Sequence, residues 1–405
     1  MRRSALLILL CLAVVFYSCD SRAGEVRISF VGDIIMHIPV KNSVQYRNIH
    51  NAEGTASLNN RGFDFLFERV RDDLQGSDVV VGNMEFPIAP PFSSKPRIFN
   101  CRPEILPAMK KAGFTMMHIA NNHILDQADR GVVTTMGFIR NSGMDYLGVG
   151  ENEPAARAGL MKTVRGIRIG FLGYTGLLNY HRPRRPSGYY LNWFYDRGKV
   201  IADIEAMKKR ADFIVMVVHA GVEYDRVPSN RDVKLMREYI DHGVDLVIGH
   251  HSHVIQPVER VLAKDGRVSF IFYSLGNFVS NQNPTPALMI DGYPITPRDA
   301  IIVHCMLRGN GPGERPDAVF NVVPVHTVNE RERDTGLRVI QAVAIDRHIE
   351  MLKKELSGST AKEKVDIERR IQNLYQKITT IKRALFGKKS YGEIRYRHGY
   401  GGYGR

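Results

Sequence analysis

The chain has 405 residues, 44% of them hydrophobic, so it can bury a sizeable core and is not a disordered polypeptide. Its 56 lysines and arginines exceed its 42 acidic residues, and the net charge of +14 favours anionic partners such as lipid headgroups, phosphates and polyanionic polymers. Nucleic acid is not an expected partner, because no aromatic-rich binding motif accompanies the positive charge.

The first 23 residues have the features of an export signal. Two arginines precede an apolar run, Ala5–Tyr17, which is too short to span a bilayer comfortably and is typical of a signal peptide. Ser21-Arg22-Ala23 offers a cleavage site for secretion, whereas Cys19 offers a residue that a lipoprotein signal would leave acylated. Both routes remain open, as does an uncleaved signal anchor. We expect an exported protein, either periplasmic or attached to the extracytoplasmic face of a membrane.

Beyond Cys19 the chain has two cysteines, Cys101 and Cys305. Export would bring them into an oxidising compartment, where they can pair. The sequence does not set the distance between their Cα atoms, so a disulfide and two separate buried thiols both remain open.

Short apolar runs rich in β-branched residues alternate with amphipathic segments between residues 25 and 330, which indicates one large α/β domain. The predicted strands are Val26–Val31, Val79–Val81, Ile167–Leu172, Phe213–Val218, Leu246–Ile248 and Phe270–Tyr273. The predicted helices are Phe63–Leu74, Pro103–Ala112, Gly131–Asn141, Lys199–Arg210 and Arg231–His242. Several of these helices are followed by a glycine, which suits a left-handed C-terminal cap.

The last apolar runs of this domain follow one another without a helix between them. They are Val268–Phe278, Ala300–Leu307 and Ala318–Val325. Since parallel strands need a long crossover connection, we expect these strands to pair antiparallel.

The composition changes after residue 330. Residues 331–387 carry apolar positions spaced by three and four, with a Ser357-Gly358-Ser359 break between Leu356 and Ile367, which predicts a helical hairpin with a coiled-coil-like seam. Residues 388–405 are rich in Gly, Tyr, Lys and Arg, and we expect a basic, flexible tail that forms no core.

Polar side chains follow the predicted strands of the first half, at the positions where each strand ends. Asp33 and Glu85 close the first two, and Asn122, His123 and Asp126 follow the strand-like segment after them. Because neighbouring strand ends converge on one edge of an α/β sheet, we expect these side chains to share a site.

The second half adds imidazoles at the same kind of position. His219 ends one predicted strand, and a second is followed by the histidine cluster at residues 250–253. In an extended segment His251 and His253 point to the same face, so we expect His250 to point away from them. Asn277 ends a further strand and is a candidate supporting residue.

Any one of these residues alone is more often a cap, a turn former or a structural histidine. Together they form a mixed set of oxygen and nitrogen donors, which suits Mn²⁺, Fe or Zn²⁺. The sequence has no Cys-x-x-Cys pair and therefore no sign of a structural thiolate site. The combination predicts a metal centre at the strand ends.

The order of these motifs over residues 26–278 resembles the CapA family of poly-γ-glutamate capsule biosynthesis proteins. The motifs are Gly32-Asp33, Asn83-Met84-Glu85-Phe86-Pro87, Asn121-Asn122-His123 with Asp126, His219-Ala220-Gly221-Val222-Glu223-Tyr224, Gly249-His250-His251-Ser252-His253 and Tyr273-Ser274-Leu275-Gly276-Asn277-Phe278. The resemblance implies the fold of the calcineurin-like metallophosphatase superfamily, a two-sheet β-sandwich flanked by helices with a two-metal centre at the strand ends.

The same resemblance implies a role for each residue. Asp33 would bind the first metal, Glu85 would bridge the two ions, and Asn122 would bind the second. His123 would protonate the leaving group, with Asp126 orienting it. The remaining expected ligands are His219, His251 and His253, and the expected supporting residues are His37, Asn83, Glu223 and Asn277.

The sequence departs from the family pattern in two places. The usual Asp-x-His opening is Asp33-Ile34-Ile35 here, so the first metal lacks a histidine unless His37 reaches back. Ala220 stands where CapA proteins commonly carry Trp, which would alter substrate contacts.

The resemblance implies a metal-dependent hydrolase in capsule or polyanionic polymer biosynthesis, and both a phosphoester and a γ-glutamyl amide remain open as the reacting bond. Expected partners are the anionic polymer or a phosphorylated envelope substrate, capsule-synthesis subunits, and the membrane through a lipid anchor. The arginine-rich segment at residues 181–185 either contacts a polyanion or is an exposed loop.

Two other functions stay open. The protein could be a non-catalytic, membrane-anchored subunit of a polymer synthesis or export complex, using the old site only for binding. Alternatively, the helical hairpin could be the functional part, as an oligomerisation or docking module.

Overall fold

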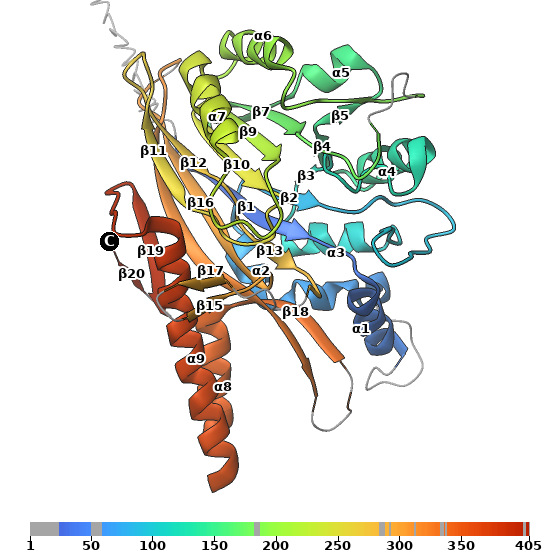
Figure 1. The fold of residues 1–405 in the computed structure, drawn as a ribbon, viewed down its shortest axis with the longest axis vertical. Coiled ribbons are helices and arrows are strands. Elements are labelled where there is room, and N and C mark those ends of the chain that lie inside the picture. The colour runs from blue at the N-terminus through green and yellow to red at the C-terminus, as the bar shows by residue number, and fades with distance from the viewer. Residues whose placement is uncertain are drawn as a thin grey trace, which may run out of the picture.

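Two large sheets lie face to face, with helices on their outer sides (Figure 1). The computed structural model describes residues 24–49, 59–181, 187–282, 288–290, 293–311, 313–332, 336, 338–399 and 402–404. The predicted signal at residues 1–23, and residues 182–186 of the arginine-rich segment, lie outside these described residues.

The larger sheet has ten strands in the order β20-β19-β17-β16-β1-β2-β3-β4, with β13 beside β1 and β18 beside β17. They are β1 (Val26–Ile34), β2 (Val79–Met84), β3 (Met116–His118), β4 (Asp145–Leu147), β13 (Asn277–Val279), β16 (Asp299–Arg308), β17 (Asp317–Arg331), β18 (Arg338–Ala344), β19 (Ile394–Gly399) and β20 (Gly402–Gly404). The strands β1 to β4 are mutually parallel, and β16 pairs antiparallel with β1 on its other side. The first strand of the chain is therefore central in this sheet.

The second sheet has six strands in the order β11-β12-β10-β9-β7-β6. They are β6 (Leu160–Val164), β7 (Ile167–Thr175), β9 (Phe213–His219), β10 (Leu246–His250), β11 (Val258–Leu262) and β12 (Val268–Phe272). Two small pairs complete the strands, β5 (Val149–Gly150) with β8 (Tyr190–Leu191) and β14 (Leu288–Ile290) with β15 (Tyr293–Ile295).

Strands such as β9 are apolar throughout because both of their faces are buried. Its Phe213, Val215 and Val217 point into the core between the two sheets, whereas Ile214 and Met216 pack against the outer helices. The same alternation is seen in β2, whose neighbouring valines pack on opposite sides of the sheet. Period-two burial thus builds three apolar layers, one between the sheets and one under each set of helices.

The helices cover the outer faces of the two sheets (Figure 1). Those packed on the larger sheet are α1 (Ile38–Ile49), the 3-10 segments η1 (Asn59–Leu66) and η2 (Glu68–Val70), α2 (Arg71–Leu74), α3 (Ile105–Ala112) and α4 (Ala128–Asn141). Those on the second sheet are α6 (Arg197–Lys208) and α7 (Asn230–His242), while the short α5 (Glu153–Arg157) contacts β5 and β8. The predicted two-sheet α/β sandwich flanked by helices is confirmed.

The predicted element types hold with two differences. Residues 63–74, predicted as one helix, form mainly 3-10 turns. The first of these, η1, begins at Asn59 and is interrupted by the positive φ angles of Asn60, Arg61 and Gly62. The antiparallel expectation is wrong for Val268–Phe278, which meets Ala300–Leu307 only in an isolated bridge and divides between the two sheets. Its end, β13, pairs parallel with β1, and its beginning, β12, pairs parallel with β10. The strand β12 pairs antiparallel only with β11, and that hairpin turns the chain back so that β12 lies beside β10 in the same direction. For β16 and β17 the antiparallel prediction is confirmed.

The C-terminal hairpin consists of α8 (Ile345–Leu356) and α9 (Ala361–Phe386), which confirms the predicted helix pair (Figure 1). The large sheet continues across the predicted boundary at residue 330, because β18 returns beside β17 before α8 begins. A capping box between Thr360 and Glu363 starts α9. The apolar side of both helices joins the core between the sheets, so the hairpin is part of the sandwich.

The tail differs from the coreless segment that we expected. Residues 394–396 of β19 pair in parallel with β17, and Ile394 and Tyr396 are buried. The hydroxyl of Tyr396 donates to the carbonyl of Ile378, so aromatic residues anchor this segment on α9. Cys101 and Cys305 are both buried, free thiols. Within the described part of the chain, the helices include none that is long and apolar enough to cross a membrane.

Candidate metal centre

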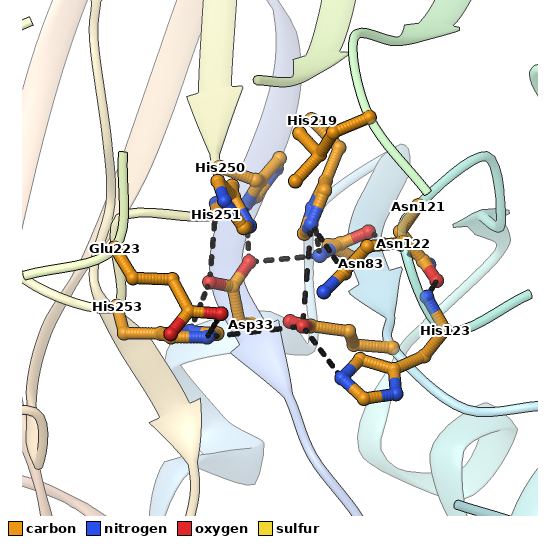
Figure 2. A network of polar contacts seen from close by, with 12 residues as sticks. Asp33, Asn83, Asn121, Asn122, His123, His219, Glu223, His250, His251 and His253 are labelled. Atoms are coloured by element: carbon orange, nitrogen blue, oxygen red, sulfur yellow. Dashed lines mark hydrogen bonds and ion pairs between the residues drawn. The ribbon is translucent and has the colours of Figure 1, made fainter. Parts of the chain in front are cut away.

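Strand ends of both sheets meet at one edge of the sandwich (Figure 2). The parallel strands β1 and β2 bring Asp33 and Glu85 there, and β9 and β10 end in His219 and His250. All four side chains are buried. Strand-end convergence, predicted from the sequence, therefore brings residues from distant parts of the chain together.

Two glycines allow the backbone to close around this edge. A Cβ atom on Gly32 would lie 2.0 Å from the carbonyl oxygen of Gly276, and one on Gly249 would lie 2.0 Å from that of Tyr273. Both distances are far below any real carbon–oxygen contact, so neither position accepts a side chain. Next to Gly32, the amide of Asp33 donates to the Gly276 carbonyl over 2.9 Å. Glycine thus precedes Asp33 and His250 because the ends of β1 and β10 are packed against backbone.

Asp33 is held by donors on both of its oxygens. Asn83 Nδ2 donates to Oδ1 over 2.8 Å, and His250 Nδ1 lies 3.0 Å from the same oxygen. His253 Nδ1 lies 3.3 Å from Oδ2, and the amide of His251 donates to it over 3.4 Å. Burial alone would raise the pKa of Asp33, but the contacts with His250 and His253 outweigh burial and hold it well below its usual range.

Glu85 has the opposite environment, because neither of its carboxylate oxygens has a hydrogen-bond partner although the side chain is fully buried. Three imidazole nitrogens surround Oε1, with Nε2 of His123 and His253 at 3.9 Å and Nε2 of His219 at 4.0 Å. Burial raises the pKa of Glu85 well above its usual range.

These spacings fit a divalent cation. Ligands about 2.0–2.2 Å from an ion lie roughly 3–4 Å from one another, which is too long for a hydrogen bond and close to the spacing around Oε1. A buried carboxylate without a partner is costly, and a cation would supply the missing interaction. The donor set and the unpartnered Glu85 oxygens are therefore consistent with a metal centre.

Among the described residues, two groups of side chains could hold an ion, and His253 belongs to both. One consists of Asp33, Glu85 and His253, and the other of Glu223, His251 and His253, with the ligand atoms of each group within 4.8 Å of one another. Burial lowers the pKa of His251 to about 3, so its ring is neutral and can donate a lone pair. For His253, the nearby carboxylates outweigh burial and raise the pKa to about 9.

The histidine cluster differs from the predicted extended segment. His250 is the last residue of β10, and His251 and His253 have positive φ of 96° and 60°. The alternation of a strand does not extend past His250, so its side chain also points into the site, toward Asp33 (Figure 2). The expectation that His250 points away is therefore wrong. Its position at the end of the apolar β10 run was the signal that could have identified it.

Asn122 and His219 contact each other on the far side of the site. His219 Nε2 lies 2.9 Å from Asn122 Oδ1, and His219 Nδ1 lies 3.1 Å from Asn83 Nδ2. Asn121 donates to the carbonyl of Met84 over 2.9 Å and ties the turn after β3 to β2.

His123 is oriented by two contacts that fix its ring. Its Nδ1 lies 2.7 Å from Asp126 Oδ2, and Phe99 stacks on the imidazole with centroids 4.1 Å apart and an interplanar angle of 28°. The amide of Phe99 also donates to Asp126. The Nε2 atom therefore faces Glu85. Asn179 Nδ2 lies 3.3 Å from the ring, and neither Phe99 nor Asn179 carried a sequence signal.

Asn277 orients His253. Both amide hydrogens of Asn277 are donated, to Gln282 Oε1 over 2.7 Å and to the Pro297 carbonyl over 2.8 Å. Its Oδ1 must therefore face His253 Nδ1, which lies 3.0 Å away. A proton is thereby kept on Nδ1 of His253, and the other ring nitrogen faces Glu85 and Glu223, where an ion would replace the second proton of the charged ring.

His37 takes another position from the one needed to ligate a metal beside Asp33. Its Nδ1 accepts the amide of Asn281 over 3.2 Å, and its ring packs edge-on against Phe99. It belongs to neither of the two ligand groups found among the described residues. His250 occupies the space beside Asp33 instead.

A two-sheet α/β sandwich with buried His, Asp, Glu and Asn side chains at its strand ends is a candidate metalloprotein, and the comparisons assign the family. Residues 27–282 match the model of the bacterial capsule synthesis protein PGA_cap. The chain is 30% identical over 311 residues to the capsule biosynthesis protein CapA of Bacillus anthracis, covering 75% of this chain and 67% of that protein. It is 31% identical over 304 residues to the PGA biosynthesis protein CapA of Bacillus subtilis, covering 73% and 70%.

This chain therefore belongs to the PGA_cap capsule synthesis family, and the resemblance found in its motifs is confirmed. Solved structures are more distant. A Staphylococcus aureus chain assigned as a 5'-nucleotidase gives a TM-score of 0.43 at 12% identity, covering 86% of this chain and 58% of that chain. A Mycoplasma pneumoniae phosphatase gives a TM-score of 0.38 at 12% identity, covering 74% and 94%.

Proposed function

We propose that this protein is an exported, membrane-associated hydrolase that uses divalent metal ions in the biosynthesis of a poly-γ-glutamate capsule or a similar polyanionic envelope polymer. Its family and its two CapA relatives support the pathway, and the strand-end cluster supports the chemistry. The reacting bond is a phosphoester or a γ-glutamyl amide. The anionic polymer and capsule-synthesis subunits are the proposed partners.

One observation carries the proposal of metal-dependent chemistry. Glu85 is fully buried, its two oxygens have no hydrogen-bond partner, and three imidazole nitrogens face it at 3.9–4.0 Å. A structural carboxylate in that position would be expected to have donors, as Asp33 does. The surroundings of Glu85 therefore suit a carboxylate that binds a cation better than one with a purely structural role.

The proposed ligands are the residues that surround this point. They are Asp33, Glu85, Asn122, His219, His251 and His253, holding one or two ions of Mn, Fe or Zn. When bound, such ions activate water and stabilise charge on the bond being cleaved. Glu223 and Asn83 would steady the ligands, the first beside His253 and the second between Asp33 and His219.

His123 is the proposed proton donor to the leaving group. The contact with Asp126 keeps one ring proton on Nδ1, and the Phe99 stack prevents the ring from turning. A proton carried on Nε2 therefore points toward the Glu85 side of the site. Asp126 is a positioning residue, because it acts through His123.

A second candidate function is a non-catalytic subunit that uses the site only for binding. The observation in its favour is that Asp33, the proposed ligand of the first metal, already accepts from Asn83 and contacts two imidazoles. With His37 engaged by Asn281, that end of the site offers fewer free ligands than the Glu85 end. Such a subunit would need the site's shape and charge but no proton donor.

The isosteric substitution Glu85→Gln tests the metal centre. Burial favours the neutral form of Glu85, so the metal-free protein should tolerate glutamine and melt within about 2 °C of the wild type. Without the carboxylate, metal affinity should fall more than about 100-fold, because losing a ligand should lower the affinity at least as much as losing a residue that only orients a ligand. Elemental analysis and scanning calorimetry with and without chelator measure both effects. Equal metal content in the two proteins would refute the centre.

Activity is tested on a panel of chromogenic phosphodiesters and γ-linked glutamate oligomers. The hydrolase proposal predicts that one class is cleaved and that His123→Ala lowers kcat while metal content is retained. Loss of cleavage in Glu85→Gln is the matched control. A His123→Ala variant that still supports full capsule formation would favour the non-catalytic subunit instead.

A further inference from the structure

A groove lies between the end of α9 and two loops that lead from the metal centre. Its volume is about 430 Å³, and its floor is apolar, formed by Ile255, Val258, Leu385 and Phe386. We call it the C-terminal groove. The exposed side chain of Val227 continues the apolar surface at its rim.

The charges around the C-terminal groove all have the same sign. Arg226, Arg383, Lys388 and Lys389 line it, and its described lining contains no acidic residue. Cations are favoured at the end of a helix, which accounts for the three from α9 and its C-terminus. Arg226 comes from the loop after β9 and faces the same groove, so the positive rim is assembled from separate parts of the chain.

Two loops connect the metal centre with the C-terminal groove. The loop that carries Glu223 continues to Arg226, and the loop that carries His253 continues to Ile255. Gln256 Nε2 donates to the carbonyl of Asp225 over 2.8 Å, which joins the two loops. Two residues of chain span at most about 7 Å, so Ile255 lies within one or two monomer lengths of His253.

We propose that the C-terminal groove binds a linear polycarboxylate whose acidic groups are separated by methylene segments, and thereby holds the polymer beside the metal centre. The methylene segments would lie on the apolar floor, and the carboxylates would pair with Lys388 and Lys389. An extended chain seated in the groove would lie next to the two loops that carry Glu223 and His253. The binding site itself is new, and the role of feeding a reaction rests on the proposed function.

The test measures binding separately from hydrolysis. A fluorescein-labelled decamer of γ-linked glutamate is titrated with the full chain after chelator treatment, and fluorescence anisotropy is recorded. The substitutions Lys388→Gln and Lys389→Gln, made together, should weaken binding about tenfold or more. The exposed Val227→Asp should also weaken binding without disturbing the fold, because its side chain is on the surface.

The matched control is the pair Lys353→Gln and Lys354→Gln on α8, which removes the same net charge from exposed positions elsewhere on the hairpin. Its affinity should stay within about twofold of the wild type, because both double substitutions lower the net charge equally and only Lys388 and Lys389 line the groove. A decamer whose carboxylates are converted to amides should bind at least about tenfold more weakly. That comparison separates carboxylate recognition from attachment of the label.

Three results would overturn the proposal. They are equal decamer affinity in the Lys388 and Lys389 variant and the Lys353 and Lys354 control, equal binding of the amide decamer, and binding of phosphatidylglycerol vesicles through Lys388 and Lys389 without decamer binding. The last result would make the groove a lipid site. The binding assay contains no metal, so it does not depend on hydrolysis, and decamer binding without hydrolysis would count against the proposed function only. Cleavage of short substrates together with unaltered decamer binding in the variants would count against the groove only.

Discussion

Asn277 decides which ring nitrogen of His253 faces the metal centre. Its NH₂ group has two acceptors, Gln282 and Pro297, so the amide cannot turn over without losing both. The remaining oxygen accepts from His253 Nδ1. Metal-binding histidines are commonly fixed in this way by a partner on the other nitrogen, which sets the tautomer before the ion arrives.

We predict that Asn277→Ala lowers metal affinity about 10–100-fold, because His253 Nδ1 loses the nearer of its two acceptors and keeps only the longer contact with Asp33. Asn277→Asp retains an acceptor for His253 Nδ1 and should lose less metal affinity than the alanine variant. Competition against a chromophoric chelator measures the affinity, and a thermal melt of the metal-free proteins provides the check on folding. If the alanine variant bound metal as tightly as the wild type, Asn277 would have no positioning role.

For single residues, the sequence predicted most members of the strand-end site but not how their side chains are arranged. Asp33, Glu85, His219 and the His251 and His253 pair were found because each follows an apolar strand. His250 was misplaced because strand alternation was carried past the end of β10, where positive φ angles change the direction of the side chains. Phe99 was missed because contacts that depend on a distant loop leave no local pattern in the sequence.

Among the elements, the hairpin is attached to the site by a chain of polar contacts. Lys377 of α9 lies 2.6 Å from Asp299, whose carboxylate is fully buried. The other oxygen of Asp299 accepts from the amide and hydroxyl of Thr296, next to the Pro297 carbonyl that holds Asn277. The hairpin therefore supports the loop that positions His253.

We predict that Lys377→Met lowers the free energy of unfolding by about 3 kcal/mol, because it leaves the buried Asp299 carboxylate without its cation. Adding Asp299→Asn should restore much of the loss. Lys364→Met, an exposed position on the same helix, should cause no measurable change. Urea unfolding monitored by circular dichroism gives the midpoints. A loss in Lys364→Met as large as in Lys377→Met would exclude the ion pair as the cause.

The hairpin also has a pH-sensitive contact with the sheet. His326 of β17 and His348 of α8 stack with their rings 4.9 Å apart, and His326 Nε2 lies 2.7 Å from His348 Nδ1. Burial, with help from Arg370 and Arg69, lowers the pKa of His348 to about 4. Burial likewise holds the pKa of His326 well below its usual range.

We predict that acid weakens this contact. In the unfolded chain His348 takes up a proton near pH 6.5, but in the folded protein only near pH 4, so its contribution is complete above pH 6.5 and is lost as the pH falls to 4. The loss is on the order of 3 kcal/mol. The variant His348→Gln should lack this part of the decline when urea unfolding is compared at pH 7 and pH 4.5. Identical declines in both proteins would show that the pKa of His348 is the same in the folded and unfolded chains, which would contradict the prediction.

The hypothesis that the hairpin is an independent docking module is not favoured by its packing. Ile349, Leu352, Ile367, Leu374 and Ile378 pack in the core between the sheets. The three- and four-residue spacing predicted the two helices, since local periodicity determines which face is apolar. It could not predict what that face covers, because the partners are strands far away in the sequence. The same reason explains why β19 was taken for a flexible tail.

For the whole molecule, the proposed export leads to a prediction about the residues before the sandwich. We expect the mature protein to begin either at an acylated Cys19 or near Gly24. Intact-mass spectrometry of protein purified from membrane and soluble fractions distinguishes the two, and Cys19→Ser should abolish the first. A mature protein that retains residues 1–18 in every fraction would instead indicate an uncleaved signal anchor.

The position of β1 has a consequence for the order in which the molecule can be assembled. Val26 pairs with Leu307 and Val31 with Ile302, so the central strand of the ten-stranded sheet pairs with a strand that is synthesised about two thirds of the chain later. Contacts so distant in sequence slow folding, because a long loop must close before they form. The strand β1 therefore cannot complete its pairing on the β16 side until the chain has been synthesised as far as residue 307. A chain whose central strand is completed this late stays unfolded, and can pass through a narrow pore, for longer than a chain that folds from its first residues onward.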